Sequence, residues 1–500
     1  MQFKKLGNTE IDVSLICLGT MTWGEQNTKE DAFEQMNYAV ENGINFFDTA
    51  ELYAVPPKEE TYGLTESYIG EWFEQKKNRD KIILASKVAG RSGMKWMRGE
   101  ESRLDKKNIT KALEDSLKRL KTDYLDLYQL HWPDRKTNFF GQLGYEHDEN
   151  DDSIPLEDTL EVLNDIVKKG LIRYIGISNE TPWGAMQLIK IAEEKKLARI
   201  VSIQNPYNLL NRTYEIGLAE VSIREKCGLL AYSPLGFGAL SGKYLNNQWP
   251  EKARLTLFKE FTRYLNPIAI KCTEEYVKIA KENNLNPAQM SLAYINAKSF
   301  VTSNIIGATT MDQLKENIES INVKLDEKVI EKIEEVHKLP IREERAQEIA
   351  ETLKGKIPCI YANGVMTPVA YRWRCQIEEN AKQLAFHHEI PEMNHNEIVG
   401  WENPPEDFAV VLIRDNQEDE IIENRFNATK KVAWESRIEF DLAWNIEVVE
   451  VLAEGESLLA RMMSGVMLGD LVSLKLAEMN GVDPTPVTVI ENLKTELDGK

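Results

Sequence analysis

Features that mark several protein classes are scarce or missing in this 500-residue sequence. Its cysteines are odd in number and scattered without a CxxC pair, at Cys17, Cys227, Cys272, Cys359 and Cys375. This usage suits reduced thiols and argues against a disulfide framework or a zinc site. The sequence also lacks any run of about 18 apolar residues, the length that a membrane-spanning helix needs. We therefore expect no metal site and no membrane span.

Signals for export and for binding nucleic acid are missing too. The first residues, Met1 to Lys5, lead into a polar turn and contain no apolar signal-peptide core. The formal net charge is −20, whereas binding to a phosphate backbone requires a cationic protein face. We therefore expect a cytoplasmic protein that has no general affinity for nucleic acid.

The length predicts more than one domain, because a single core rarely organises 500 residues. The composition, 42% hydrophobic and 28% charged, is typical of a soluble globular protein. The negative charge is uneven, since residues 341–500 hold about 30 acidic residues against about 16 basic ones. A solvated acidic surface explains the excess, and the change in composition indicates a separate unit. We predict domains at residues 1–340 and 341–500.

After a hairpin predicted at residues 2–14, with its turn at Gly7-Asn8, short apolar runs alternate with helical patterns. The runs have the character of buried parallel strands and cover residues 15–18, 44–47, 82–86, 125–130, 173–177, 200–203, 229–231 and 303–306. The helical patterns cover residues 30–41, 64–75, 108–120, 155–169, 182–193, 213–226, 288–297 and 311–320. Eight strand–helix units over about 300 residues predict a (β/α)8 barrel, the TIM-barrel class of α/β fold.

The alternative fold is a doubly wound Rossmann sheet, which would carry a glycine-rich dinucleotide fingerprint. No GxGxxG motif follows any of the predicted strands, and the closest string, residues 236–242, has the wrong spacing. A P-loop is also missing from the sequence. The barrel is therefore the favoured fold for the first domain.

Polar residues follow the predicted strands where these leave the core. Asp48 ends the second strand with Tyr53 just beyond it, Lys87 ends the third strand, and His131 ends the fourth. In a barrel the carboxyl ends of all strands meet at one mouth, where the catalytic groups of such folds lie. A single polar residue at a strand end is more often a loop cap than a catalyst. The prediction of a site therefore depends on the convergence of all four.

These four side chains together form a proton-donating set. A buried ammonium beside a phenol lowers the phenol pKa, so Lys87 would let Tyr53 donate and re-accept a proton near neutral pH. Asp48 would keep Lys87 charged and in place, and His131 would orient a carbonyl oxygen. No nucleophile–base pair and no metal-ligand cluster stands out in the sequence. Proton delivery to a carbonyl then needs an external hydride, which predicts a nicotinamide cofactor.

Residues 1–338 resemble the aldo-keto reductases, in particular a branch of bacterial reductases that also resembles the β subunits of voltage-gated potassium channels. The motifs that carry the resemblance occur in the family's order at residues 17–24 (CLGTMTWG), 48–53 (DTAELY), 85–87 (ASK), 130–133 (LHWP), 176–180 (GISNE), 231–235 (AYSPL) and 307–317 (GATTMDQLKEN). The resemblance implies NAD(P)H-dependent reduction of small aldehydes or ketones. It also implies that Tyr53 is the general acid, supported by Lys87, Asp48 and His131.

The resemblance further implies a cofactor site along the barrel mouth. Ser178, Asn179 and Gln204 would hold the nicotinamide carboxamide, and Tyr232 would stack on the ring. Residues 233–243 would cover the pyrophosphate, and residues 307–317 would bind the adenosine end. The positions that match cofactor-binding positions of the family are Thr20, Ser178, Asn179, Gln204, Tyr232, Ser233, Pro234, Leu235, Lys243, Gly307, Thr309, Gln313, Glu316 and Asn317.

NADPH is the predicted cofactor, because family members usually prefer it, and NADH is the alternative. Gln313 stands where many relatives carry an arginine against the 2′-phosphate, and Gly307 stands where many carry a lysine. Lys243 or Arg254 would have to compensate. A second alternative is a cofactor-sensing binding module like the channel β subunits, in which the residue that matches His131 is commonly asparagine. The histidine favours the enzyme.

An insertion rich in Asn, Asp and Gly, residues 132–153, follows His131 directly. It would be either a surface loop or a lid that faces the substrate. Its position beside a candidate catalytic residue keeps both interpretations open.

Residues 341–500 carry their own alternation of helices and strands. A charged helical run at residues 341–354 precedes strands predicted at 357–361, 384–387 and 408–413, and a long apolar helix is predicted at 461–479. Residues 341–497 resemble the C-terminal half of bifunctional phosphoglucose/phosphomannose isomerases, which have the SIS fold, a smaller α/β domain with a flavodoxin-type parallel sheet. The motifs are residues 368–376 (PVAYRWRCQ), 379–382 (ENAK), 391–397 (PEMNHNE) and 481–487 (GVDPTPV).

By this resemblance Glu379 matches the base that moves the sugar C1/C2 proton, and His395 matches the ring-opening histidine that is given across a dimer. Lys494 matches a C-terminal active-site lysine. The N-terminal SIS half, which supplies the Ser/Thr cluster that grips the sugar phosphate, has no counterpart in residues 1–340. Without phosphate binding the three residues have little to act on. The second domain would be either a sugar-phosphate isomerase that binds a carbohydrate derivative, or a retained fold that forms a homodimer.

Overall fold

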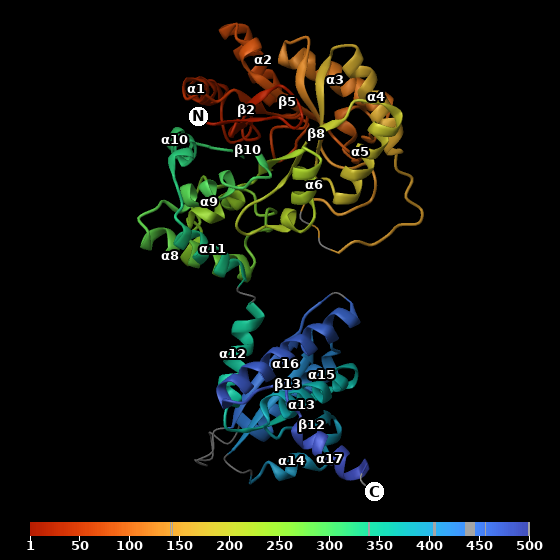
Figure 1. Ribbon diagram of the computed structural model, residues 1–500, viewed down its shortest axis with the longest axis vertical. Helices are drawn as coiled ribbons and strands as arrows, with labels where there is room; N and C mark the ends of the chain where they lie inside the picture. The colour runs from red at the N-terminus through yellow and green to blue at the C-terminus, as the bar shows by residue number, and fades with distance from the viewer. Residues whose placement is uncertain are drawn as a thin grey trace. The chain divides into compact units, whose positions relative to one another are not determined.

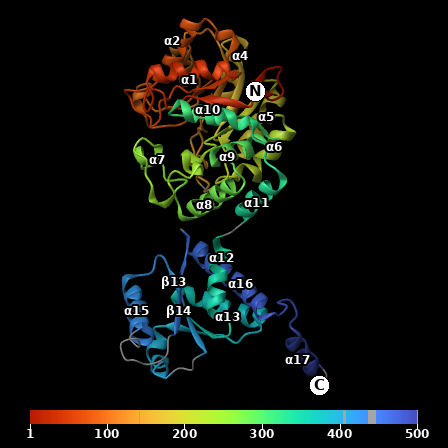
Figure 2. The ribbon, with the colours of Figure 1, turned by 90° about the vertical axis from the view of Figure 1, so that its left-hand side faces the viewer.

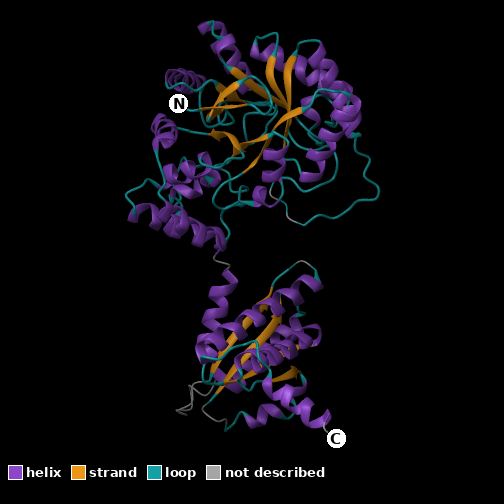
Figure 3. Ribbon diagram, viewed as in Figure 1, coloured by secondary structure: helices purple, strands orange, loops and turns teal. Residues whose placement is uncertain are grey.

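The computed structural model describes residues 1–140, 142, 144–338, 341–403, 407–435, 446–455 and 457–498. The chain divides into two compact units, residues 1–337 and 338–500. The predicted boundary follows Pro340, which lies outside the described residues. In each unit the strands lie inside and helices cover them (Figure 3).

The first unit is built on a closed barrel of eight strands in the order β10-β3-β4-β5-β6-β7-β8-β9 (Figure 1). Every neighbouring pair runs parallel. The strands are β3 (Ile16–Gly19), β4 (Phe46–Asp48), β5 (Ile83–Val88), β6 (Leu125–Leu130), β7 (Ile172–Ser178), β8 (Ile200–Pro206), β9 (Gly228–Tyr232) and β10 (Val301–Ile306). All eight coincide with strands predicted from the sequence, which confirms the (β/α)8 barrel.

Helices form the outer layer of the barrel. They are α1 (Lys29–Glu41), α2 (Leu64–Lys76), α3 (Lys106–Leu120), α4 (Leu156–Lys168), α5 (Pro182–Lys195), α6 (Leu218–Arg224), α7 (Arg254–Leu257), α8 (Pro267–Glu282), α9 (Pro287–Asn296), α10 (Met311–Glu319) and α11 (Glu327–Lys338). Local chemistry sets their starts: a capping box between Thr28 and Asp31 opens α1, and the Thr181 side chain caps α5. The helix predicted at residues 213–226 is divided into a 3₁₀ turn and α6, with Gly217 between them.

The N-terminal hairpin closes one end of the barrel. Its strands are β1 (Phe3–Lys5) and β2 (Asp12–Ser14), which pair antiparallel. A Cβ on Gly7 in the turn, where φ is +60°, would lie 2.4 Å from the carbonyl oxygen of Val201, so this approach requires glycine. Leu6 and Val13 pack with the apolar barrel interior. The opposite end, the mouth formed by the carboxyl ends of the strands, is therefore the one left for a site.

The second unit is a four-stranded parallel sheet in the order β12-β11-β13-β14. Its strands are β11 (Ile357–Asn363), β12 (Phe386–Ile390), β13 (Phe408–Asp415) and β14 (Glu447–Ala453). Its helices are α12 (Ile341–Leu353), α13 (Thr367–Ala381), α14 (Glu397–Gly400), α15 (Glu420–Lys430), α16 (Leu458–Asn480) and α17 (Thr488–Asp498). The strand order, with the second strand outside the first, is that of the predicted flavodoxin-type sheet.

A glycine contact organises the helices on one face of this sheet. Helices α13 and α16 lie side by side (Figure 2). Trp373 of α13 is fully buried and donates from Nε1 to the carbonyl oxygen of Gly465, at 2.8 Å. A Cβ on Gly469 would lie 2.3 Å from the Trp373 ring, so the indole fits only against a helix without a side chain at that point. The long apolar helix predicted at residues 461–479 is confirmed within α16.

Candidate active site

The mouth of the barrel opens into a cavity of about 1120 Å³. Three of the four predicted catalytic residues line it, Asp48, Tyr53 and His131, and Lys87 lies directly behind them. Every predicted cofactor residue lines it as well: Thr20, Ser178, Asn179, Gln204, Tyr232, Ser233, Pro234, Leu235, Lys243, Gly307, Thr309, Gln313, Glu316 and Asn317. The cavity is thus assembled from loops that are far apart in the sequence.

Lys87 at the end of β5 is the centre of the polar cluster. Its ammonium donates to Asp48 Oδ2 at 2.6 Å, to the carbonyl oxygen of Thr49 at 2.9 Å and to the hydroxyl of Tyr53 at 3.1 Å. The Lys87 side chain is fully buried, so all three of its donor positions are used inside the protein. The ammonium, carboxylate and phenol that were predicted to converge do so.

Asp48 is held by two amides as well as by Lys87. Its Oδ1 accepts from Gln129 Nε2 at 3.0 Å and from Gln204 Nε2 at 2.8 Å. Gln204 Nε2 also donates to Gln129 Oε1 at 3.1 Å, so only the side-chain oxygen Oε1 of Gln204 is left to meet a carboxamide. Sequence reasoning gave Gln129 no role. Its place at the end of a strand, two residues before His131, is the signal that could have found it.

The pKa shifts of Lys87 and Tyr53 correct one expectation. Burial lowers the pKa of Lys87, but Asp48 and Tyr53 outweigh it, so the net pKa is raised and the ammonium stays charged. Burial raises the pKa of Tyr53, and the opposing effect of Lys87 is too small to reverse this. The prediction that Lys87 brings the phenol pKa down towards neutrality is therefore wrong. The phenol is a protonated group that can donate over the whole physiological pH range.

His131 is a buried, neutral imidazole. Burial, with Lys87 as the second cause, holds its pKa well below the usual range. Its ring lies edge-on to that of Tyr53, with the ring centres 5.8 Å apart. Nδ1 is buried and has no hydrogen-bond partner among the described residues. The imidazole therefore stands beside the phenol as a dipole and not as a second charge.

The loop that carries Tyr53 is fixed by a buried carboxylate, that of Glu51. Its Oε1 accepts from the backbone N–H of Ala89 at 2.8 Å. Its Oε2 accepts from the Tyr62 hydroxyl at 2.8 Å and from Arg98 Nη1 at 2.6 Å. This network was not predicted, because Arg98 lies 47 positions from Glu51 in an irregular segment and no local pattern marks the pair.

Side chains at the ends of β7 and β9 form a connected set on another wall. The Tyr232 hydroxyl donates to Asn179 Oδ1 at 2.6 Å, and Asn179 Nδ2 donates to the carbonyl oxygen of His131 at 2.9 Å. Ser178 donates to the carbonyl oxygen of Gln204 at 2.8 Å. Asn179 has φ +53°, a left-handed conformation that asparagine tolerates better than most residues. The tyrosine ring is thereby fixed at the cavity wall.

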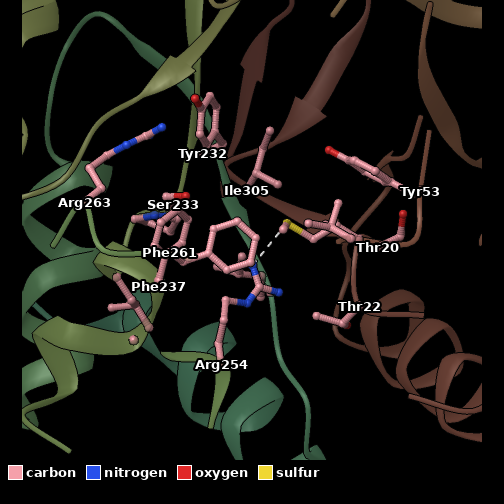
Figure 4. Close-up of a pocket in the computed structure, with 18 of the residues that line it drawn as sticks. Thr20, Thr22, Tyr53, Tyr232, Ser233, Phe237, Arg254, Phe261, Arg263 and Ile305 are labelled. Carbon is pink, nitrogen blue, oxygen red and sulfur yellow. Dashed lines mark hydrogen bonds between the residues drawn. The ribbon is translucent and has the colours of Figure 1, made fainter. Parts of the chain in front are cut away.

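Two cations that line the cavity, Lys243 and Arg254, form no ion pair among the residues that the structure describes. Burial and the neighbouring Arg254 lower the pKa of Lys243. Burial lowers the pKa of Arg254 to about 10. Arg254 points into the cavity, where Nη1 meets the Met21 sulfur at 3.6 Å (Figure 4). Buried cations without a counter-ion are costly, so this wall fits an anionic ligand such as a pyrophosphate.

The loop after β10 forms the other end of the cavity. Thr309 donates to Gln313 Oε1 from its backbone N–H at 3.0 Å and from its hydroxyl at 3.1 Å. Asn27 Nδ2 donates to the carbonyl oxygen of Thr309 at 2.9 Å, and Asn317 Nδ2 to that of Gly307 at 3.4 Å. Gly307 has open space where a Cβ would be. The wall with Lys243 and Arg254, the wall with Tyr232 and this loop together fit an extended dinucleotide.

No helix among the described residues combines the length and the apolar character needed to cross a membrane. Nor do three or more His, Cys, Asp or Glu side chains of those residues group as metal ligands would.

A model of the aldo/keto reductase family matches residues 15–338, more than half of the chain. The chain belongs to the aldo-keto reductase family. Protein Tas of Escherichia coli (strain K12) is 53% identical over 341 residues, which are 68% of this chain and 98% of that protein. The match thus covers almost the whole of Protein Tas, while about a third of this chain has no counterpart in that protein.

Two further relatives represent different branches of the aldo-keto reductases. The uncharacterized oxidoreductase YrpG of Bacillus subtilis (strain 168) is 33% identical over 344 residues, 67% of this chain and 96% of that protein. A probable voltage-gated potassium channel subunit beta of Arabidopsis thaliana is 30% identical over 347 residues, 67% of this chain and 96% of that protein. The family and these relatives identify the first domain as that of an oxidoreductase.

The insertion of this aldo-keto reductase, residues 132–153, is tied to the barrel and reaches the cavity. Asp134 accepts from the Arg103 guanidinium, with Nη2 2.9 Å from Oδ1, and Asp152 pairs with Arg91 at 2.6 Å. Its apolar side chains Trp132, Phe139 and Phe140 line the cavity. Of the two interpretations, this placement of the described residues favours a segment that faces the substrate over a surface loop, and whether it acts as a lid stays a prediction.

A model of the bacterial phospho-glucose isomerase C-terminal SIS domain matches residues 342–497, which identifies the second unit as an SIS domain. Glu379 on α13, His395 after β12 and Lys494 on α17 are all exposed. None of the hydrogen bonds or ion pairs between described residues joins any two of them. Within one chain, the structure does not bring these predicted isomerase residues into a polar cluster.

Proposed function

We propose that this protein is an NADPH-dependent reductase of small aldehydes and ketones. The observation that carries the proposal is the Lys87 ammonium, which binds both the Asp48 carboxylate and the Tyr53 hydroxyl at the base of a cavity that fits a dinucleotide. A protonated phenol, a charged ammonium and a neutral imidazole are a set suited to protonating a carbonyl oxygen.

In the proposed reaction the residues handle the proton. A bound reduced nicotinamide supplies the hydride to the carbonyl carbon. Tyr53 gives its hydroxyl proton to the carbonyl oxygen, and the Lys87 ammonium, 3.1 Å away, stabilises the phenolate that remains. His131 orients the carbonyl oxygen by a hydrogen bond, which its neutral state allows without competing for the Tyr53 proton. Uptake of one hydride and one proton converts the carbonyl to an alcohol.

The choice of NADPH over NADH rests on the cations Lys243 and Arg254. A dinucleotide pyrophosphate and an additional 2′-phosphate offer the counter-charge that these two side chains lack among the described residues. Gln313 is held by Thr309 and contributes an amide instead of a charge. Arg254→Gln is therefore expected to weaken NADPH binding at least about tenfold more than NADH binding.

The test is spectrophotometric. The purified protein is incubated with NADPH and a panel of small aldehydes and ketones, and the loss of absorbance of the reduced cofactor is followed, with Tyr53→Phe as the control. We expect turnover by the wild type and a loss of at least about 10²-fold in the variant. Oxidation of NADPH by the wild type no faster than by Tyr53→Phe would exclude the proposal.

For the SIS domain we propose a homodimerisation role. Helix α17 has no buried residue, and Val489, Leu493 and Leu497 form an apolar stripe at helical spacing that is 59–82% exposed. Figure 2 shows α17 at the edge of the domain. A second copy of the chain is the proposed occupant, because a homodimer is also what His395, exposed and without a polar contact to Glu379 among the described residues, would need to complete a site.

A further inference from the structure

Arg263, in the segment between β9 and α8, is one of five cations that line the barrel cavity, with Arg91, Lys243, Lys252 and Arg254. Its guanidinium lies beside Tyr232, on the wall opposite Tyr53 (Figure 4). Nη2 donates to the backbone carbonyl oxygen of Phe140 in the insertion. Nη1 is buried and forms no hydrogen bond to any residue that the structure describes. No carboxylate of the described residues forms an ion pair with Arg263.

A half-buried guanidinium that has no carboxylate partner among the described residues gains charge-assisted hydrogen bonds when an anionic ligand binds beside it. The proposed cofactor does not need Arg263, since Lys243 and Arg254 already serve its phosphates. Arg263 instead lies beside Tyr232 and contacts the insertion, across the cavity from Tyr53 (Figure 4). Its guanidinium therefore lines the space in which a substrate would lie between the two walls.

We propose that Arg263 binds an anionic group of the substrate, so that this enzyme prefers carbonyl compounds that carry a carboxylate or a phosphate away from the carbonyl. The inference rests on the proposed reductase function and names its substrate class. A planar guanidinium suits either anion, because it offers parallel donors that match carboxylate and phosphate oxygens.

The neighbouring walls indicate what lies between the carbonyl and the anion. Trp132, Phe139 and Phe140 of the insertion line the cavity, and the ring centres of Trp132 and Phe140 are 5.6 Å apart. Leu52 and Met94 pack against this group of side chains. An apolar body between carbonyl and anion buries surface against these rings, so an aromatic aldehyde with a carboxylate is the best probe.

The rival role for Arg263 is structural, as a link between the β9 loop and the insertion through Phe140. A link would affect every substrate alike, because it only shapes the cavity. Recognition of an anion would affect charged substrates and leave neutral ones alone. The two roles are therefore separated by discrimination between substrates and not by the loss of activity itself.

The experiment compares kcat/KM for 4-carboxybenzaldehyde and its neutral ester, methyl 4-formylbenzoate, with NADPH saturating. Glyceraldehyde 3-phosphate against glyceraldehyde forms the phosphate arm, and the arm with the larger preference identifies the anion. We expect the wild type to prefer the charged member of a pair by roughly 20-fold, and Arg263→Gln to reduce this to less than about threefold. Lys259→Gln, which removes an exposed charge of the same loop outside the cavity, is expected to keep the preference.

Three outcomes would overturn the inference: no preference in the wild type, an equal loss on both members of a pair in Arg263→Gln, or weaker NADPH binding as the only effect. If no carbonyl is reduced at all, the reductase proposal fails. The anion site is then judged by calorimetric titration with benzoate, with benzamide as the neutral control. Benzoate binding that is lost in Arg263→Gln supports the site, and equal binding of both compounds contradicts it.

Discussion

Both domains carry clear family motifs, but the predicted functional residues differ between them in burial and in polar contacts. In the barrel, Asp48, Tyr53 and Lys87 are buried and bound to one another within 3.1 Å. In the SIS domain, Glu379 and His395 are exposed and share no polar contact. A motif therefore specifies a fold in both domains, and a completed chemical cluster in only one of them.

The physical reason for the difference lies in what each fold can supply alone. A closed barrel brings eight strand ends to one mouth, so residues from different strands meet within a single chain. An open four-stranded sheet does not close its strand ends into a ring, so fewer of them converge on one point. Among the described residues of the SIS domain, Glu379, His395 and Lys494 accordingly form no polar contact with one another.

We expect the largest effect from removing Lys87, the residue at the centre of the polar cluster in the barrel. Lys87→Met leaves the Asp48 carboxylate buried without its counter-ion, so we expect a loss of about 3–5 kcal/mol in the free energy of unfolding. The same change should lower kcat/KM for carbonyl reduction by at least about 10³-fold, because Tyr53 loses its cationic partner. Denaturant unfolding and steady-state kinetics measure the two effects.

A double variant tests whether the loss of stability comes from the unpaired Asp48 carboxylate. Asp48→Asn combined with Lys87→Met removes both charges, so stability should recover while activity stays low. Wild-type stability in the single variant would show that the ion pair does not hold the barrel mouth together.

The pH dependence tests the state of Tyr53. The reductive direction needs the protonated phenol, and burial raises its pKa, so kcat/KM should be flat from about pH 6 to 9 and fall only above. Oxidation of the alcohol needs the phenolate, so its rate should rise about tenfold per pH unit between pH 7 and 9. His131 contributes no inflection near neutrality, because its pKa is lowered. A reductive profile that falls with an apparent pKa near 7 contradicts this assignment.

Much of the barrel could be predicted because its strands are short apolar runs between regular helices, and the strand ends then place the site. The Asp48–Lys87–Tyr53 contact follows from the fold alone. The pKa of Tyr53 does not, because its sign depends on how completely packing removes the phenol from water. The Glu51–Arg98 network joins irregular segments that are far apart in the sequence, and hydrophobic periodicity predicts only regular helices and strands.

The SIS domain shows a different limit. Strand β14 was missed, since its sequence EVVEVLA places two glutamates in a run that has no turn signal in front of it. In the structure Arg414 and Lys430 pair with Glu450, at 3.0 Å and 2.7 Å, and thereby make an acidic edge strand acceptable. Ion-pair partners that lie 20 to 36 positions away cannot be predicted from the sequence pattern of the strand itself.

A smaller effect, on assembly instead of chemistry, concerns α17. Leu493→Glu places a charge in the apolar stripe, so we expect the wild type to sediment as a dimer and the variant as a monomer. Glu491→Gln, two positions away and thus on another face of the helix, should leave the dimer intact. Reductase activity per chain should stay within about twofold in both variants, because the barrel site is complete in one chain. A monomeric wild type would contradict the dimer.

The smallest expected effect comes from the isomerase motif. Because Glu379 is exposed and unconnected to His395 and Lys494, Glu379→Gln should change stability by no more than about 0.5 kcal/mol. It should leave reductase activity unchanged, and a coupled assay with fructose 6-phosphate should detect no isomerisation by wild type or variant. Isomerisation that disappears in Glu379→Gln would show that a partner copy completes the sugar site. The contrast between the domains would then hold only for the single chain, with the barrel building its cluster in folding and the SIS domain building its own in assembly.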